Sequence, residues 1–112
     1  MRNVSRDTVL GDRVAAASTS AARNKGLLKH SVLPEGHGLW IVPCEGIHTF
    51  FMKFAIDVVY IDRKKRVCKV VRQLTPWRVS WCLPAHSVIE LPVGAIERSG
   101  TRSGDQLEFE AA

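Results

Sequence analysis

Cysteine is scarce in this chain, and its placement excludes two common ways of stabilising a small protein. The 112 residues include three cysteines, an odd number, widely spaced and without a C-x-x-C pair: Cys44, Cys68 and Cys82. A disulfide framework needs paired cysteines, and a structural zinc site needs several closely spaced ligands. We therefore expect reduced, mostly buried thiols, and the sequence indicates no cofactor.

The sequence also lacks a long hydrophobic run. No apolar stretch reaches the roughly 18 residues of a membrane-spanning helix. Residues 1–20 include Arg2, Arg6 and Asp7 and have no uninterrupted apolar core of the kind found in signal peptides. We expect a cytoplasmic protein without a membrane span, although a chain whose export signal had been removed would have the same features.

The overall composition is that of a folded protein. Apolar residues make up 46% and charged residues 24% of the chain, which distinguishes it from a disordered segment. A chain of this length forms one modest core. We therefore expect residues 1–112 to be a single domain.

Acidic residues are missing from one segment of an otherwise mixed sequence. Residues 63–78 contain seven basic and no acidic side chains, whereas the rest of the chain has nine basic and eleven acidic ones. Four of the basic residues are consecutive at an expected hairpin tip: Arg63, Lys64, Lys65 and Arg66. A solvated turn explains this cluster. The 63–72 hairpin could instead dock on phosphate, but it lacks interleaved aromatics for base stacking, so nucleic acid is not the favoured partner.

Two elements are expected near the N-terminus. Residues 8–15 have the pattern of a β-hairpin, with Gly11 able to adopt the positive φ of a type II′ turn. A hydroxyl side chain at 18–20 can cap a helix that ends at about residue 28.

Short strands account for most of the remaining sequence. Val58–Ile61 is continuously apolar, which predicts a strand covered on both faces. Residues 93–99 have the pattern of a short helix, with Gly100 as its left-handed stop. The expected strands cover residues 38–42, 49–52, 56–61, 67–73, 81–83, 86–92 and 106–110. The predicted fold is therefore α+β and mostly β: a compact, barrel-like antiparallel or mixed sheet with two short helices.

Several motifs together resemble a known prokaryotic family. They are His48-Thr49-Phe50, Met52-Lys53-Phe54, Ile56–Asp62, Glu90–Gly94 and Ser103-Gly104-Asp105. This combination resembles the domain of unknown function 192 (DUF192) family, with similarity from about residue 21 to residue 109. Members commonly have proline where this chain has Ala55, a departure that should loosen one turn. The resemblance implies a small β-rich domain and supplies no reaction, cofactor or partner.

The sharpest candidate for chemistry is the pair His48 and Asp57. A histidine held by a carboxylate can act as a general base or as an oriented metal ligand. Glu90, on another strand, could join them in a divalent-metal site of a hydrolase-like enzyme. In the structural interpretation, which is preferred, Asp57 accepts backbone N–H bonds at the turn after Phe54 and His48 binds a loop carbonyl.

Other catalytic patterns are weaker. Cys44 lies four residues before His48, but no spacing requires the two to form a nucleophile and base. Gly94 could present backbone N–H groups to an anion at the start of a helix. The phosphate-binding patterns GxGxxG and GxxxxGK[ST] are absent, so ordinary helix geometry is the preferred explanation.

Core packing is the preferred explanation for most of the aromatic residues, and an exposed aromatic groove is the alternative. Adjacent Phe50 and Phe51 would point to opposite faces of a strand, so both cannot enter one core. One of them could stand at a groove rim with Trp77, where rigid apolar area suits a ligand or another protein.

The leading hypothesis is a non-catalytic binding or accessory domain. Its groove would be near His48, Met52, Asp57, Trp77 and Glu90. The alternatives are the metal-assisted enzyme and the nucleic-acid module described above. The sequence does not identify the ligand, the partner or the oligomeric state.

Overall fold

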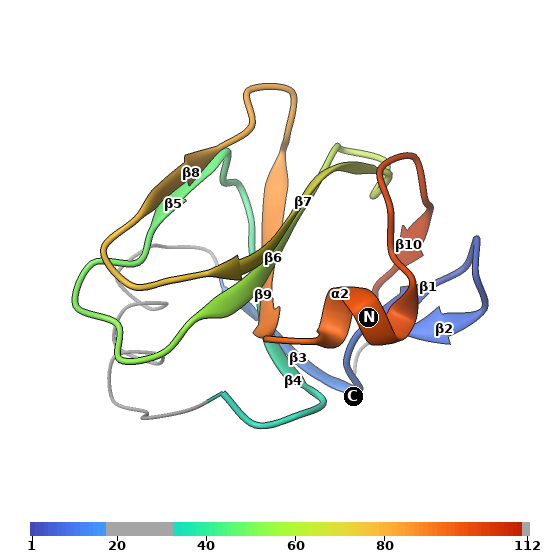
Figure 1. Cartoon of the computed structure of the whole chain (residues 1–112). Helices are drawn as coiled ribbons and strands as arrows, with labels where there is room; N and C mark the ends of the chain where they lie inside the picture. Colours follow the sequence, from blue (N-terminus) through green and yellow to red (C-terminus); the bar gives the residue numbers. More distant parts are fainter. Residues whose placement is uncertain (18–32, 111–112) are drawn as a thin grey trace.

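The computed structural model describes residues 1–17 and 33–110, in which strands dominate (Figure 1). Their bounds are β1 Arg2–Asn3, β2 Thr8–Val9, β3 Arg13–Ala17, β4 His37–Ile41, β5 Gly46–His48, β6 Ile56–Ile61, β7 Val67–Leu74, β8 Val79–Trp81, β9 Ser87–Pro92 and β10 Leu107–Glu108. The described residues contain one helix, α2, at Ala95–Ser99. The protein is therefore α+β in class and mostly β.

A five-stranded sheet forms the centre of the molecule, in the order β3-β4-β9-β6-β7 (Figure 1). β3 runs parallel to β4, and the other neighbouring strands are antiparallel. Every residue of β6 and of β9 is buried. The apolar run Val58–Ile61 predicted such a strand, and the prediction is confirmed because layers cover both faces of the sheet.

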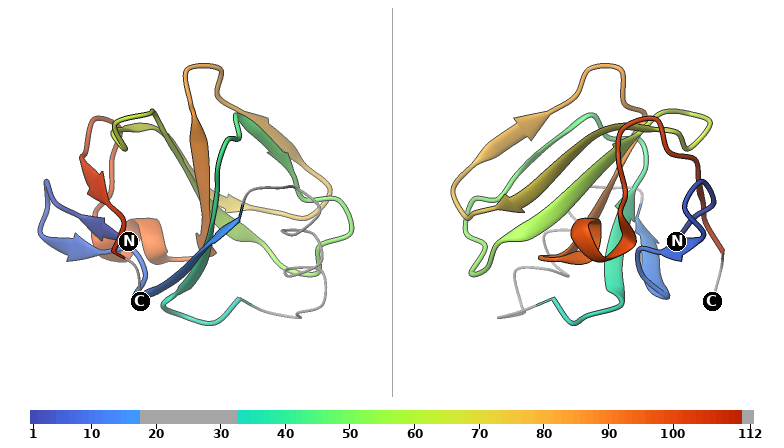
Figure 2. Two further views of the ribbon diagram at one scale, coloured as in Figure 1. Left: turned by 180° about the vertical axis from the view of Figure 1, so that it is seen from behind. Right: turned by 45° about the vertical axis from the view of Figure 1, so that its right-hand side comes forward.

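Alternate residues of β6 enter two separate hydrophobic cores. Val59 and Ile61 belong to one core, and Val58 and Tyr60 belong to the other. This division follows from the two-residue period of a strand. The first core packs against α2 and the small sheet β10-β1-β2, and the second packs against the antiparallel pair β5–β8. Figure 2 shows the two coverings on opposite sides of the central sheet.

The sheets do not close into a barrel, so that part of the sequence prediction is wrong. The strands form three separate sheets, and the central one ends at β3 on one side and β7 on the other. β1, β2 and β10 have only two residues each, and β5 and β8 have three. Strands this short cover a face of the central sheet but provide too few hydrogen bonds to bridge its edges.

One of the two expected helices is present in the described residues. The helix predicted over 93–99 is confirmed in a shorter form, Ala95–Ser99, and Gly100 ends it with φ 68°. The helix predicted from 18–20 to 28 lies outside the described residues. None of the helices in the described part of the chain has the length and apolarity needed to cross a membrane.

The predicted hairpin over 8–15 is wrong. β2 pairs with β1, whereas β3 pairs in parallel with β4. Gly11 is required for a different reason, since a Cβ there would lie 2.8 Å from the carbonyl oxygen of Gly36. The chain crosses another backbone segment at this point and does not turn back on itself.

Two other predicted strands lie earlier in the chain than expected. The strand expected at 49–52 is a turn, in which the Met52 N–H donates to the Thr49 carbonyl at 3.2 Å. The paired residues are instead Gly46–His48, opposite Val79–Trp81, where the sequence predicted a strand over 81–83. The aromatic residues of 49–52 have high strand propensity, but the Thr49 hydroxyl binds to a second turn and the chain bends there.

Candidate site: an exposed aromatic ribbon

The most unusual surface of the protein is the outer face of the β5–β8 pair. Large apolar side chains are exposed there and in the adjoining turns: Phe50, Phe51, Trp77, Val79, Trp81 and Leu83. We call this set the aromatic ribbon. Phe51 is 68% exposed, Trp77 57% and Trp81 61%. Isolated exposed apolar side chains are common in soluble proteins, but a contiguous group marks an interaction surface.

The strand pairing explains which side chains of the ribbon point outward. Ile47 pairs with Ser80, and both are buried against the second core. The Tyr60 hydroxyl lies 2.9 Å from the Ser80 hydroxyl, which joins β8 to the central sheet. The residues on either side of Ser80 therefore point away from the core, as the two-residue period of a strand requires.

Thr49 joins the two turns that carry the aromatic side chains at one end of the ribbon. Its hydroxyl donates to the Thr75 carbonyl at 2.7 Å and accepts from the Arg78 N–H at 2.9 Å. Its carbonyl accepts from the Trp77 N–H at 3.1 Å. Thr49 is fully buried. These bonds fix the turn at 49–52 against the turn at 75–78.

Two of the exposed aromatic residues have strained backbones. Phe51 has φ 67° and Trp77 has φ 65°. A bulky residue with positive φ is an outlier that costs on the order of 1–3 kcal/mol. Such strain persists where the surrounding structure imposes it, and here it holds two large rings outward.

The rings at this end of the ribbon form a continuous stack. The His48 ring lies 4.9 Å from that of Phe50, which in turn lies 5.8 Å from Trp77. Phe51 meets Trp77 edge-on at 4.8 Å. These stacked and edge-on contacts hold the rings in a fixed arrangement, in which part of each exposed ring faces solvent.

Of the five residues predicted for a groove, His48 and Trp77 lie at the aromatic ribbon and the other three are buried. His48 and Trp77 both contact Phe50 in the aromatic ribbon. Met52, Asp57 and Glu90 are buried, with Met52 in the second core. Of the five, Trp77 belongs to the aromatic ribbon and His48 contacts it through Phe50.

Asp57 and Glu90 lie on opposite faces of the central sheet. Asp57 is paired with Leu91, whose side chain is in the first core. Glu90 is paired with Val58, whose side chain is in the second core. Paired residues share a face, so these two carboxylates point apart. The described residues contain no group of three His, Cys, Asp or Glu side chains suited to a metal ion, and His48, Asp57 and Glu90 do not converge.

The Asp57 carboxylate binds backbone N–H groups from two other elements. One oxygen accepts from Gln73 at 3.0 Å, and the other accepts from Gly94 at 3.1 Å and Ile96 at 3.0 Å. The preferred structural interpretation predicted backbone partners, but they are not at the turn after Phe54. Gly94 is the N-cap of α2 and supplies no capping side chain, so Asp57 takes that role from β6.

The two groups considered for weaker catalytic roles, the Gly94 N–H and the Cys44 thiol, both form hydrogen bonds within the protein. The Gly94 N–H, predicted as a possible anion donor, is bound to Asp57. The Cys44 thiol lies 3.0 Å from the Gly46 carbonyl, to which it donates. Cys44 shares a cavity of about 350 Å³ with His86, which the sequence did not single out as its neighbour.

The basic hairpin tip has the geometry of an ordinary turn. An Asp62 carboxylate oxygen accepts from the N–H groups of Lys64 and Arg66 at 2.8 and 2.9 Å. The tip is nevertheless close to the segment that follows the ribbon, because Arg63 and Lys64 line a cavity of about 430 Å³ together with Pro84–His86.

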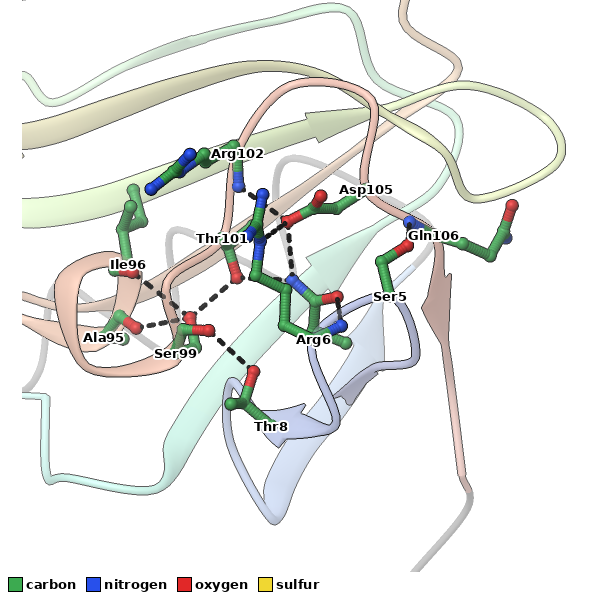
Figure 3. A network of polar contacts seen from close by, with 11 residues as sticks. Ser5, Arg6, Thr8, Ala95, Ile96, Ser99, Thr101, Arg102, Asp105 and Gln106 are labelled. Atoms are coloured by element: carbon green, nitrogen blue, oxygen red, sulfur yellow. Dashed lines mark hydrogen bonds and ion pairs between the residues drawn. The ribbon is translucent and has the colours of Figure 1, made fainter.

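A buried polar network lies on the far side of the protein and ties the N-terminal strands to residues 99–106 (Figure 3). Asp105 accepts from Asn3 at 3.0 Å and from Arg6 at 2.9 Å. Thr101 and Ser99 complete the cluster with hydroxyl contacts. Burial opposes ionisation of Asp105, but its hydrogen bonds and the Arg6 charge outweigh that effect and lower the pKa of its carboxyl. The polar atoms of this network bind one another, which indicates a structural role.

One pattern in the sequence coincides with the aromatic ribbon, although it was not used to predict a site. Large apolar residues alternate at 77, 79, 81 and 83. That pattern predicts a half-buried strand with these residues inside. The structure reverses the orientation, because the small Ser80 side chain faces the core and the large ones face solvent.

Comparison with known proteins identifies the family without identifying an activity. The model of the DUF192 family, described as an "Uncharacterized ACR", matches residues 2–109, a longer stretch than the predicted 21–109. A UPF0127 protein of Thermococcus sibiricus is 32% identical over 96% of this chain and 73% of its own length. A UPF0127 protein of Pyrococcus furiosus is 30% identical over 97% of both chains.

Two solved structures share the fold. A protein of unknown function from Novosphingobium aromaticivorans superposes with a TM-score of 0.74 at 22% identity, over 86% of this chain and 74% of that one. A protein from Sinorhizobium meliloti, described as a candidate transcription regulator, gives a TM-score of 0.75 at 21% identity, over 85% and 79%. At these identities the likeness shows the fold alone.

Proposed function

The chain belongs to the DUF192 family, whose members are uncharacterised, and from its geometry we propose that it is a non-catalytic binding domain that uses the aromatic ribbon. The observation that carries the proposal is the grouping of exposed Phe51, Trp77 and Trp81 on one narrow face.

The chemistry of the ribbon is that of a recognition surface. Tryptophan and phenylalanine supply large, rigid contact area at a small cost in conformational entropy, and tryptophan is frequent among the residues that dominate binding energy. The strained backbones at Phe51 and Trp77 support the same conclusion, since folding alone gives no benefit from holding these rings in water.

The three tryptophans allow a direct test. Trp40 is remote from the ribbon, where its ring packs on Phe109 and its N–H donates to the Ser87 hydroxyl at 2.8 Å. In a Trp40→Phe protein, all indole fluorescence comes from Trp77 and Trp81. We expect at least one ligand class to shift this emission in a saturable way. The classes to test are an oligodeoxythymidylate, a glutamate-rich peptide, a cello-oligosaccharide and anionic lipid vesicles.

A matched pair of variants separates binding by the ribbon from binding elsewhere. Trp77→Asn with Trp81→Thr removes both indoles while respecting the backbone, because asparagine tolerates positive φ and threonine suits a strand. Val9→Thr makes an exposed apolar side chain on β2 more polar, at a site outside the ribbon. Anisotropy of labelled ligands should show lost binding in the first variant alone. Failure of all four classes to bind, or binding that survives in the double variant, would disprove the proposal.

A further inference from the structure

Acidic residues are absent from both segments that build the ribbon. Residues 46–56 and 63–89 contain no aspartate or glutamate, although the whole chain has eleven acidic side chains. The same segments contain Lys53 and the seven basic residues of 63–78. The two segments that form the aromatic ribbon therefore contribute only positive formal charge.

Basic side chains flank the ribbon at both ends and at its centre. Lys53 and Arg78 are exposed beside the turns that carry Phe51 and Trp77. The Lys69 ammonium donates to the Trp81 carbonyl at 3.0 Å. At the other end, Arg63 and Lys64 border the cavity lined by Pro84–His86. The basic hairpin tip thus lies beside the segment that directly follows the ribbon, although the two are far apart in the sequence.

We propose that the aromatic ribbon binds single-stranded nucleic acid. This inference rests on the proposed function and names its ligand class. Bases stack on the exposed faces of Trp77 and Trp81, while phosphates are attracted by the flanking lysine and arginine side chains. This pairing of a basic track with aromatic platforms is how proteins bind single strands without reading their sequence.

The side-chain spacing along one face of β8 is similar to the spacing of nucleotides in an extended single strand. Residues i and i+2 on one face of a strand are separated by about 7 Å, which is close to the length of one extended nucleotide. Val79 and Trp81 are such a pair on β8, and Trp77 lies in the turn that precedes this strand. Single strands fit better than duplexes, because bases can stack on exposed ring faces only when they are not paired and stacked within a duplex.

An acidic polypeptide is negatively charged like a nucleic acid, but its shape fits the aromatic ribbon less well. Peptides that add to an exposed sheet edge use alternate side-chain pockets. The ribbon presents convex rings instead, including Phe51 and Trp77, which project from turns with φ 67° and 65°. Each nucleotide of a single strand carries a flat base, and such bases can stack on projecting rings.

Fluorescence anisotropy with a labelled oligodeoxythymidylate of about 12 nucleotides tests the inference. We expect saturable binding at low salt that weakens by at least about 10-fold in Trp77→Asn/Trp81→Thr and is unchanged in Val9→Thr. An abasic oligomer of the same length should bind at least about 10-fold more weakly than the thymidylate, since it carries phosphates without bases.

The contribution of charge is measured from the salt dependence. Replacing Arg63 and Lys64 with glutamine should reduce the slope of log Kd against log salt concentration by up to about 1.4. Replacing Arg13 and Arg102, two exposed arginines outside the acid-free segments, is the matched control and should leave it unchanged. Circular dichroism melts verify that each variant is folded.

The outcomes separate this inference from the proposed function. Binding of a glutamate-rich peptide without the oligonucleotide overturns the nucleic-acid inference and leaves the binding domain in place. Equal affinity for the abasic oligomer, or full affinity in the double variant, also overturns it, because the attraction would then be to charge alone. Failure of every ligand class tested above overturns both proposals.

Discussion

The clearest prediction for stability concerns Asp57, which joins three elements through backbone bonds. Its carboxylate accepts from Gln73 on β7 and from Gly94 and Ile96 at the start of α2. An alanine at this position leaves all three N–H groups without their acceptor. It also removes the cap of a helix whose own N-cap residue is glycine.

The expected loss follows from the environment of each donor. The Ile96 N–H is buried, so leaving it unpaired costs about 1–3 kcal/mol. The Gln73 and Gly94 N–H groups are only partly buried, and water can replace the lost acceptor at about 0.5–1 kcal/mol each. Asp57→Ala should therefore lower the free energy of unfolding by about 2–5 kcal/mol, out of roughly 5–15 kcal/mol for a typical domain. Asp57→Asn keeps one acceptor oxygen and should lose less.

Urea unfolding monitored by tryptophan fluorescence measures these differences. Asp62→Ala is the matched control, because Asp62 also accepts two backbone N–H bonds but in an exposed turn, where the loss should stay near 1 kcal/mol or below. If Asp57→Ala lies within about 0.5 kcal/mol of the wild type, or loses no more than Asp62→Ala, the capping role assigned to this carboxylate is refuted.

Three pKa shifts predict further behaviour. Burial raises the pKa of Tyr60, the only tyrosine in the chain. Absorbance at 295 nm should therefore show ionisation above pH 10, and stability should fall as pH rises past the ordinary value near 10; ionisation at the free-tyrosine value would contradict this. The pKa of Asp105 is lowered, so its contribution to stability holds above about pH 4 and disappears as pH falls through the folded value. Acid unfolding of Asp105→Asn should lack that step, and a profile like that of the wild type would exclude the assignment. Burial, with the Cys82 thiol and Asp62 nearby, raises the pKa of Cys68. Iodoacetamide at neutral pH should modify Cys68 more slowly in the folded protein than in urea, as measured by mass spectrometry of the peptide, and equal rates would argue against the shift.

The buried central strand β6 could be predicted from the sequence, whereas the pairing of β3 within the central sheet could not. Val58–Ile61 is apolar at consecutive positions, and only a strand covered on both faces gives such a run a stable place. The parallel pairing of β3 with β4 depends on residues distant in sequence and on the close passage of Gly11 past Gly36. Local patterns at 8–15 suggested a hairpin because they do not contain that contact.

The candidate site was predicted in part, for a related reason. His48 and Trp77 were singled out, and both contact Phe50 in the ribbon. Trp81 was not singled out, although Val79 and Trp81 alternate with smaller residues. Alternation reveals that two faces differ and does not reveal which one is buried. Here the orientation is fixed by the contact between the Ser80 and Tyr60 hydroxyls, which joins strands twenty residues apart.

The pair His48 and Asp57 was the sharpest candidate for chemistry in the sequence, and the structure gives Asp57 a different role. A buried carboxylate must be paired or hydrogen-bonded, and Asp57 meets that requirement with backbone groups of its own fold. Folding therefore accounts for Asp57. It does not account for exposed Trp77 and Trp81, since leaving such side chains in water forgoes about 1.5–3 kcal/mol of burial for each large apolar residue. Positive φ at Trp77 adds strain to that loss. A surface that stability alone would not retain is best explained by what it contacts, and for this protein that surface is the aromatic ribbon.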